Sequence, residues 1–512
     1  MHTIINSCAT YGINAFKIEI ETNIEATVPN FFLVGLPDNA IKESRERVST
    51  AIKNSGFNYP NRRITINLAP ADIKKEGSSY DLPIAIGILS ASEQIKKDKI
   101  SEFIILGELS LEGNIRKVHG VLPIAVEIKK IGFKNIIVPF GNETEASMVD
   151  GLNVFPVKNL KDAVEILNSE KNVEPVKINI KNYFLQEQKF PIDYSDVKGQ
   201  ESVKRALEIA CAGSHNLIMI GPPGSGKTML AKRIPSILPP LSFDESIETT
   251  KIHSVAGVLP SSTSLVATRP FRSPHHTISD SALVGGGTIP RPGEISLSHH
   301  GVLFLDELPE FARNVLEVLR QPLEDKKVTI SRSKLTIDYP SNFMLVCAMN
   351  PCSCGNFGNP QKKCSCNPLQ IQKYLSKISG PLLDRIDIHI EVPAIKIDQL
   401  NEKKEGEKSE KIRERVIAAR NIQNERYNKN ENVFSNSNMQ TSEIKEFCKL
   451  TSESETVLKN AMSKLGLSAR AYDRILKVAR TIADLSASSD IKTEHIAEAI
   501  QYRSLDRNYW NF

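Results

Sequence analysis

Short apolar runs alternate with helix-like periods along the first third of the chain. Runs of strand length lie at 31–36, 64–68, 103–106 and 136–138. Apolar residues recur every three or four positions, as in helices, at 39–55, 82–92 and 121–131. We therefore expect residues 1–168 to form an α/β domain with its own core, followed by a polar linker at 169–190.

A second alternating pattern extends over residues 191–398 and predicts a second α/β domain. Its apolar runs of strand length lie at 216–220, 302–305 and 343–349, and a helical pattern follows the first of them at 229–238. Residues 399–412 are highly charged and predict a flexible hinge. The remainder, 413–512, has helical periodicity without strand runs, so the expected fold is a multidomain α/β protein with an all-helical C-terminal lid.

Composition places few limits on function. At 512 residues the chain is too long for one core, and about 100–200 residues per domain suggests roughly three domains. The net charge of +5 is small for this length and neither requires nor excludes nucleic acid as a partner. No apolar run approaches the ~18 residues of a membrane span, and the N-terminus lacks the basic-then-apolar order of a secretion signal. We expect a cytoplasmic protein with no membrane partner.

The glycine-rich loop after the strand at 216–220 carries the most specific chemistry. Its residues are Gly221, Pro222, Pro223, Gly224, Ser225, Gly226, Lys227 and Thr228. This is a Walker A pattern, in which the glycines let backbone N–H groups surround a phosphate chain. Lys227 is expected to reach the β- and γ-phosphates, and the Thr228 hydroxyl to bind Mg²⁺. The loop predicts that the chain binds and hydrolyses ATP.

Two further strand ends carry groups that an ATPase needs. The run at 302–305 ends in Asp306 and Glu307, a Walker B pattern about eighty residues after the Walker A loop. Asp306 is suited to the Mg²⁺ shell, and Glu307 to orienting and polarising the attacking water. The run at 343–349 ends at Asn350, whose amide could hold the γ-phosphate or the water. A turn-forming Asn before Pro is the simpler alternative for Asn350.

These motifs resemble the AAA+ ATPases and, more narrowly, the magnesium-chelatase-like group that contains the YifB and ComM proteins. The strings that carry the resemblance lie at 271–277, 293–297, 299–307, 380–387 and 467–474. The resemblance implies that Asn350 is sensor 1, that Arg385 is an arginine finger reaching a neighbouring subunit, and that Arg470 is sensor 2 on the lid. A finger that acts between subunits implies a ring, and the family's usual ring is a homo-hexamer.

Each arginine also has a simpler interpretation. Arg385 could form a local ion pair with Asp384 or Asp387. Arg470 could belong to a solvated helix face, and Arg474 is a rival for the sensor role. An arginine that neutralises the transferring phosphoryl group is worth ~10³–10⁵ in rate, which makes the catalytic assignments worth testing.

Four of the eight cysteines form a cluster. Cys352, Cys354, Cys364 and Cys366 lie in a loop rich in Gly, Asn and Pro. Four thiolates suit tetrahedral Zn²⁺, although the C-x-C spacing is less specific than C-x₂-C. Such a zinc would be structural, because four protein ligands leave no open position. Four reduced cysteines in a loop are the alternative.

A basic segment between the Walker B strand and Asn350 is a candidate DNA contact. Residues 326–337 alternate like a β-hairpin and contain Lys326, Lys327, Arg332 and Lys334. In related helicase-like AAA+ proteins such insertions face a central pore, where basic side chains could contact the phosphates of single-stranded or branched DNA. A solvated edge hairpin protected by charge explains the pattern nearly as well.

The N-terminal domain carries a second resemblance. Residues 73–83, followed by a helix, resemble the Lon-protease-like fold of the ribosomal S5 domain 2 type, and Ser79 falls near the Lon nucleophile. The dyad lysine should lie within 113–118, where Val118 takes its place and Lys117 is one position away. Because a one-residue slip turns a side chain elsewhere, we expect no peptidase activity from this domain.

The sequence therefore predicts a ring-forming AAA+ ATPase that couples hydrolysis to movement on DNA, with ComM-like branch migration or unwinding as the implied process. Three alternatives remain: a magnesium-chelatase-type motor that remodels a protein partner, an ATP-dependent protease, and a nucleotide-gated scaffold without nucleic acid. DNA-stimulated ATP turnover would separate the first hypothesis from the others.

Overall fold

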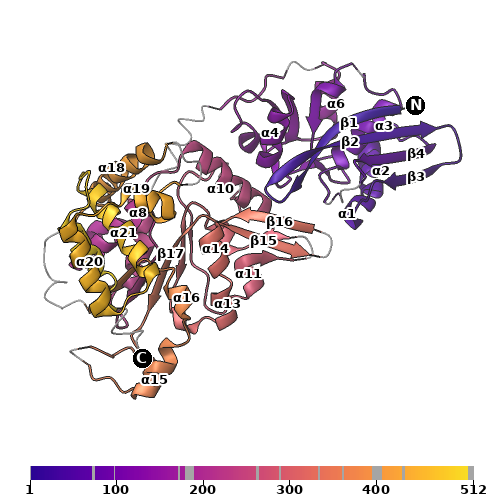
Figure 1. Ribbon diagram of the computed structural model, residues 1–512. Coiled ribbons are helices and arrows are strands. Elements are labelled where there is room, and N and C mark those ends of the chain that lie inside the picture. The colour runs from indigo at the N-terminus through magenta and orange to yellow at the C-terminus, as the bar shows by residue number, and fades with distance from the viewer. Residues whose placement is uncertain are drawn as a thin grey trace. The chain divides into compact units, whose positions relative to one another are not determined.

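The computed structural model consists of two units, each with its own sheet (Figure 1). The structure describes residues 2–71, 75, 77–96, 98–170, 173–178, 190–260, 265–287, 290–332, 335–359, 362–394, 406–428 and 433–505. The first unit comprises Met1–Glu187 and Ser246–Val266, and the second comprises Gln188–Glu245 and Ala267–Phe512. No helix in these described ranges combines the length and the apolar character needed to cross a bilayer.

The first unit is built on a seven-stranded sheet in the order β3-β4-β2-β1-β5-β8-β9. Its strands are β1 (His2–Tyr11), β2 (Asn14–Glu25), β3 (Asn30–Val34), β4 (Arg63–Ala69), β5 (Phe103–Ile105), β8 (Asn135–Pro139) and β9 (Asn153–Val157). The pairs β1–β2 and β2–β4 are antiparallel, and the other neighbours are parallel. All four strands predicted for this region are present, but the sequence did not predict β1, β2 or β9.

The first unit has helices in all three stretches where the sequence predicts them, 39–55, 82–92 and 121–131, and further helices that the sequence did not predict. They are α1 (Asn39–Lys42), α2 (Ser44–Asn54), α3 (Asp81–Ala91), α4 (Val121–Lys130), α5 (Glu143–Ala146) and α6 (Leu160–Leu167). All residues of α3 are buried, and it packs against β1 and β2 in one core with Ile5 and Ile20. Residues 246–266 join this unit through the Ser254 hydroxyl, which donates to Glu145 Oε1 at 2.6 Å.

The second unit contains a five-stranded parallel sheet in the order β11-β14-β17-β10-β18. The strands are β11 (Phe271–Arg272), β14 (Val302–Leu305), β17 (Met344–Met349), β10 (Leu217–Ile220) and β18 (Ile388–Glu391). Every residue of β10, β14 and β17 is buried, which explains why the sequence shows unbroken apolar runs there. The major flanking helices are α8 (Glu201–Gly213) and α9 (Lys227–Ile237), whereas most of α10 (Phe243–Ala256) belongs to the first unit.

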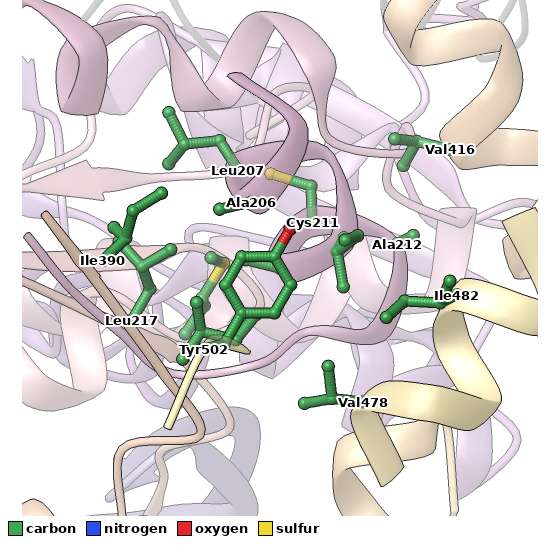
Figure 2. Packing of buried hydrophobic residues seen from close by; sticks show 14 of the residues in the cluster. Ala206, Leu207, Cys211, Ala212, Leu217, Ile390, Val416, Val478, Ile482 and Tyr502 are labelled. Atoms are coloured by element: carbon green, nitrogen blue, oxygen red, sulfur yellow. The ribbon is translucent and has the colours of Figure 1, made fainter. Parts of the chain in front are cut away.

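The C-terminal region of the second unit is helical throughout its described residues, as predicted (Figure 1). Its helices are α18 (Ser409–Tyr427), α19 (Thr441–Phe447), α20 (Ser452–Leu465), α21 (Ala469–Leu485) and α22 (Thr493–Gln501), with the 3₁₀ turn η4 (Asn436–Asn438). Figure 2 shows side chains of α8, Val416 of α18 and Ile482 of α21 packed in one core with Leu217 and Ile390 of the sheet. The helical region therefore shares its hydrophobic core with the sheet.

The C-terminal part of the charged segment 399–412, which was expected to be a flexible hinge, is helical. Residues 399–405 lie outside the described residues, and α18 already begins at Ser409. The Ser409 hydroxyl accepts a hydrogen bond from the Tyr194 backbone at 2.8 Å and lies 2.9 Å from the Ser236 hydroxyl. Buried hydroxyl contacts thus fix the start of a helix that the charge pattern alone did not reveal.

Shorter elements connect the larger ones. In the first unit they are η1 (Ile100–Glu102), β6 (Glu108–Leu109) and β7 (Ile115–Arg116). In the second unit they are η2 (Tyr194–Asp196), α11 (Asp280–Val284), β12 (Gly285–Gly286), β13 (Arg291–Pro292), α12 (Glu294–Leu297), η3 (Leu308–Glu310), α13 (Arg313–Glu317), α14 (Arg320–Asp325), α15 (Pro368–Leu375) and α16 (Gly380–Leu383). The predicted hairpin is formed by β15 (Lys327–Arg332) and β16 (Leu335–Pro340).

Candidate active site

The Walker A loop leaves the sheet at the carboxyl end of β10, a strand that lies between β17 and β18. In the register of the sheet, Ile220 pairs with Met349, and the Gly221 N–H donates to the Met349 carbonyl at 3.2 Å. Gly224 and Gly226 have φ values of +76° and +85°, which favour glycine. The loop then enters α9 at Lys227. Ligands of open parallel sheets bind at this edge, beyond the carboxyl ends of the strands.

Lys227 and Asn350 lie together at this edge of the sheet. The Lys227 ammonium donates to the carbonyls of Gly221 at 2.7 Å and Pro222 at 3.0 Å, and to Asn350 Oδ1 at 3.2 Å. Burial lowers the pKa of Lys227, while Asp306 and Glu307 act in the opposite direction. The cation is thus held over its own loop, where the oxygens of a phosphate chain could replace the carbonyls.

Thr228 and Asp306 also meet. The Thr228 hydroxyl donates to Asp306 Oδ2 at 2.6 Å, although the two residues are 78 positions apart in sequence. Asp306 directly follows β14, and its other oxygen accepts the Glu307 N–H at 2.9 Å. A hydroxyl and a carboxylate at this separation are ligands that Mg²⁺ prefers.

Glu307 has a left-handed backbone, with φ +53°, and its side chain is 57% exposed. A non-glycine residue in this region costs of order 1 kcal/mol, and such strain clusters at functional sites. His276 Nδ1 lies 3.6 Å from the Glu307 carboxylate. His276 comes from the segment 271–298, whose Arg272 is held by Glu294 through two bonds of 2.6 and 2.7 Å.

Gln200 is a residue of this site that the sequence did not predict. Its amide donates to the Ser225 carbonyl at 2.8 Å and to the Pro393 carbonyl at 3.2 Å, so it joins the loop to the segment after β18. Within the described part of the chain, Gln200 Oε1 and the Ser225 hydroxyl are buried without a hydrogen-bond partner. Buried polar atoms left unpaired at a phosphate-binding loop fit a site built for a polar ligand.

Arg385 and Arg470 have partners that differ from the expected ones. Arg385 is largely buried, forms an ion pair with Glu324 and donates to the Pro381 carbonyl at 2.6 Å. Glu324 therefore takes the place that the simpler interpretation gave to Asp384 or Asp387. Arg470 is exposed, and its guanidinium lies 3.5 Å from Asp384.

Arg474, the rival of Arg470, belongs to a buried polar network. It pairs with Asp387, which also lies 3.1 Å from His215 Nδ1, while His215 Nε2 lies 2.8 Å from the Thr481 hydroxyl. Burial alone would raise the pKa of Asp387, but Arg474 and His215 outweigh it and hold this pKa well below its ordinary value. Burial lowers the pKa of His215 despite Asp387, which keeps the ring neutral.

This network predicts loss of stability on acidification. Because the pKa of His215 is lower in the folded state than its ordinary value of about 6.5, the unfolded chain takes up a proton first as the pH falls below that value. Stability is therefore full above about pH 6.5 and is lost as the pH falls towards the folded pKa. We expect His215→Gln to flatten the decline of the thermal midpoint between pH 7 and pH 5, whereas exposed His119→Gln leaves it unchanged. Equal slopes in both variants would contradict the assignment.

The four clustered cysteines come together in space. Their sulfur atoms all lie within 4.8 Å of one another, and the Cys352–Cys354, Cys354–Cys364 and Cys352–Cys364 distances are 3.4, 3.5 and 3.7 Å. Backbone hydrogen bonds, the largest from Asn356, lower the pKa of Cys354 to about 5, which favours the thiolate that binds metals. No disulfide joins them, since all eight cysteines of the chain are free.

The basic hairpin differs from the expected arrangement. Lys326 and Lys327 lie at its base, away from the turn, because Lys327 pairs with Pro340 and Arg332 with Leu335. Lys327 forms an ion pair with Asp338 at 2.9 Å, and burial lowers the pKa of Lys326 to about 8. Lys326 and Lys327, two of the four candidate DNA contacts, thus lie at the end of the hairpin farthest from its turn. Lys334 lies outside the described residues.

In the first unit, the Ser79 carbonyl accepts a hydrogen bond from the Gly107 N–H at 3.0 Å, and the hydroxyl of the preceding Ser78 pairs with Glu108. Lys117 is exposed and Val118 is buried. The side chain at the position expected for a dyad lysine is therefore an apolar group in the core.

Comparison with known proteins agrees with this geometry. The family model described as "Magnesium chelatase, subunit ChlI" matches residues 193–400, and related models for the same subunit match residues 20–142 and 406–503. The chain is 45% identical to competence protein ComM of Haemophilus influenzae over 98% of both chains. It is 46% identical to YifB of Escherichia coli over 99% of this chain and 97% of that one. A partial similarity, 27% identity over 35% of each chain, links it to Lon protease 2 of Bacillus subtilis. The chain belongs to the YifB/ComM family of magnesium-chelatase-like AAA+ proteins.

Proposed function

We propose that this protein is an ATPase that uses hydrolysis to move on DNA. The observation that carries the first half is the meeting of Lys227, Thr228 and Asp306 at one edge of the parallel sheet, with a Thr228–Asp306 distance of 2.6 Å. Lys227 would contact the phosphates, and Thr228 and Asp306 would hold Mg²⁺. The metal supplies neutralisation of the charge on the phosphate oxygens. The unpaired Ser225 hydroxyl and the loop N–H groups supply further donors.

In this proposal Glu307 orients and polarises the attacking water, and Asn350 fixes its position as sensor 1. Glu307 is exposed at the end of a buried strand and is turned by its left-handed backbone, which suits a group that meets solvent-derived water. His276 Nδ1 lies 3.6 Å from this carboxylate. Positioning of this kind supplies most of the catalysis in phosphoryl transfer.

We further propose a homo-hexameric ring in which Arg385 reaches the nucleotide of a neighbour and Arg470 acts as sensor 2. AAA+ proteins of this family are generally oligomeric. Within the proposed layout, residues 191–398 form the AAA+ domain, residues 1–168 a Lon-like domain and residues 413–512 the lid. Zn²⁺ would occupy the four-cysteine site, and the segment 326–337 would contact DNA through basic residues such as Arg332 and Lys334.

DNA as the substrate is supported by the 45% identity to a protein named for competence and by the basic residues in the sequence of segment 326–337. We expect forked or four-way DNA to increase ATP turnover severalfold, with an effect that weakens as salt rises. Displacement of a labelled strand should require ATP. The Arg332→Ala/Lys334→Ala double variant should lose the stimulation and keep basal turnover.

Lys327→Ala is the matched control for this experiment. It removes one positive charge from the same hairpin, at the end where Asp338 already neutralises that charge. We expect stimulation in Lys327→Ala to remain within about twofold of the wild type. If DNA does not change the ATP turnover of the wild type, movement on DNA is contradicted, whereas the proposal of ATP hydrolysis is unaffected.

The family-model matches favour a second candidate, a magnesium-chelatase-type motor that remodels a protein partner. That protein would hydrolyse ATP in a ring without response to DNA. An ATP-dependent protease is less well supported, because buried Val118 occupies the position expected for the dyad lysine.

A further inference from the structure

The four-cysteine loop lies directly against the Walker A loop. Gly355, the residue after Cys354, has φ +78° and faces the ring of Pro223. A Cβ at Gly355 would lie 2.5 Å from Pro223 Cδ and 2.7 Å from Pro223 Cγ. Real Cβ atoms do not approach other atoms so closely, so the backbone at Gly355 is in contact with Pro223 and leaves no space for a methyl group.

Both ends of the cysteine loop return to Asn350. The loop begins there, and the Asn350 amide accepts the bond from Lys227 at 3.2 Å. It ends at Asn367, which caps α15 by exchanging hydrogen bonds with Gln370. On the same helix, burial raises the pKa of Tyr374, and the nearby Asn350 backbone acts in the opposite direction. Two connections therefore link the cysteine loop to the proposed nucleotide site: Gly355 through Pro223, and α15 through Asn350.

The cysteine sulfurs are spaced for one tetrahedral metal ion. With Zn–S bonds of about 2.3 Å, tetrahedral geometry separates the sulfurs by about 3.8 Å. The separations among Cys352, Cys354 and Cys364, which are 3.4, 3.5 and 3.7 Å, are close to this value and far longer than a disulfide bond, and the Cys366 sulfur lies within 4.8 Å of the other three. The Phe357 N–H also donates to Cys352 Sγ at 3.3 Å, a bond of the kind that orients thiolate ligands.

We propose that Zn²⁺ at Cys352, Cys354, Cys364 and Cys366 holds the Walker A loop in its nucleotide-binding form, so that zinc binding and ATP binding strengthen each other. Without the metal, the cysteine loop must become ordered against Pro223 when ATP binds, and this ordering costs conformational entropy. With the metal bound, that order already exists. The inference rests on the proposed nucleotide site and adds a second ligand that regulates it.

The first experiment measures both ligands on the full-length protein. We expect about one zinc and no iron per chain by elemental analysis, and none in Cys354→Ser/Cys364→Ser. The variant should bind a fluorescent ATP analogue about tenfold more weakly, within the range typical of coupled sites. By reciprocity, saturating ATP should raise the zinc affinity of the wild type, measured by chelator competition, by the same factor as zinc raises its ATP affinity. Cys8→Ala, at a buried cysteine of the first unit, is the control for loss of a thiol.

The second experiment leaves the metal ligands intact. Gly355→Ala adds a methyl group against Pro223, whereas Gly358→Ala adds one at φ +75° with no atom within 4 Å. Both substitutions impose the same left-handed strain on the same loop. We expect Gly355→Ala to keep its zinc and lose ATP affinity about tenfold, and Gly358→Ala to keep both.

The outcomes separate this inference from the proposed function. Zinc-independent ATP binding, or equal ATP affinity in the two glycine variants, overturns the coupling and leaves the ATPase proposal intact. A protein that holds no zinc even after zinc is added also overturns it. Failure of the zinc-loaded wild type to bind ATP removes the proposed function and the coupling together. If zinc and ATP strengthen each other's binding but DNA does not change ATP turnover, this inference stands and only movement on DNA is refuted.

Discussion

Replacing Glu307 with Gln is expected to lower ATP turnover by about 100-fold or more while ATP binding persists. The amide has nearly the same shape as the carboxylate but cannot accept a proton from water or polarise it through a full negative charge. Because Glu307 is exposed, the thermal midpoint should hardly change. Steady-state turnover and equilibrium binding of ATP, measured on the same preparation, test both parts, and the stalled protein should accumulate as ATP-bound rings.

Glu310→Gln is the matched control. Glu310 lies in the 3₁₀ turn that follows Glu307 and pairs at 3.5 Å with Lys377 on the surface. The Glu310→Gln substitution changes the local charge by the same amount as Glu307→Gln but leaves the proposed water-binding position intact. Its ATP turnover should therefore stay within about twofold of the wild type. Wild-type turnover in Glu307→Gln would show that another group activates the water.

Arg385→Ala is expected to lower turnover by about 10³-fold while ATP still binds, because the guanidinium of one subunit would no longer neutralise charge at the neighbour's phosphoryl group. Mixing this variant with Lys227→Ala should restore part of the activity. In such a mixture some sites combine an intact Walker loop from one subunit with an intact arginine from the next. ATP turnover across a range of mixing ratios measures the recovery.

The ion pair with Glu324 gives this experiment its controls. Arg385 is largely buried and bound to Glu324, so the guanidinium must leave this carboxylate to reach a neighbour. Glu324→Gln weakens the ion pair that holds Arg385 in place, and this variant should not lose ATP turnover. Arg320→Ala removes a half-exposed arginine from the same helix as Glu324, and its turnover should match that of the wild type. Well-formed mixed rings that show no recovery would place Arg385 in a structural role.

The strands predicted correctly are those whose burial leaves an unambiguous pattern. β10, β14 and β17 are buried on both faces, so their sequences are continuous apolar runs. The long strands β1 and β2 escaped prediction because polar residues interrupt their apolar patterns. In β2, buried residues alternate with less buried ones such as Glu19 and Glu21, and polar Asn6 and Ser7 of β1 and Thr22 of β2 lie within the core. Asn6 and Ser7 are acceptable there because distant backbone carbonyls accept their hydrogen bonds: Ser101 from Asn6 at 3.0 Å and Ile105 from Ser7 at 2.9 Å.

The same distinction applies to the candidate site. Lys227 and Thr228 belong to a contiguous motif, and Asp306 and Asn350 end apolar runs, so the chain order itself marks them. Gln200 carries no such signal, because its partners, the Ser225 and Pro393 carbonyls, are defined only by the folded backbone. Likewise the partner of Arg385 is 61 residues away in sequence, whereas the sequence offered only its immediate acidic neighbours.

The bonds from α21 to the residues just before β10 and β18 have a mechanical consequence. Arg474 meets Asp387, and Thr481 meets His215, at two points about two helical turns apart. If the helix slid gradually along the sheet, several buried charged or polar groups would lose their partners at the same time, which is energetically costly. The terminal helices are therefore restricted to discrete positions, and a nucleotide-driven stroke must proceed as a jump between alternative docked states or carry sheet and helices along as one piece.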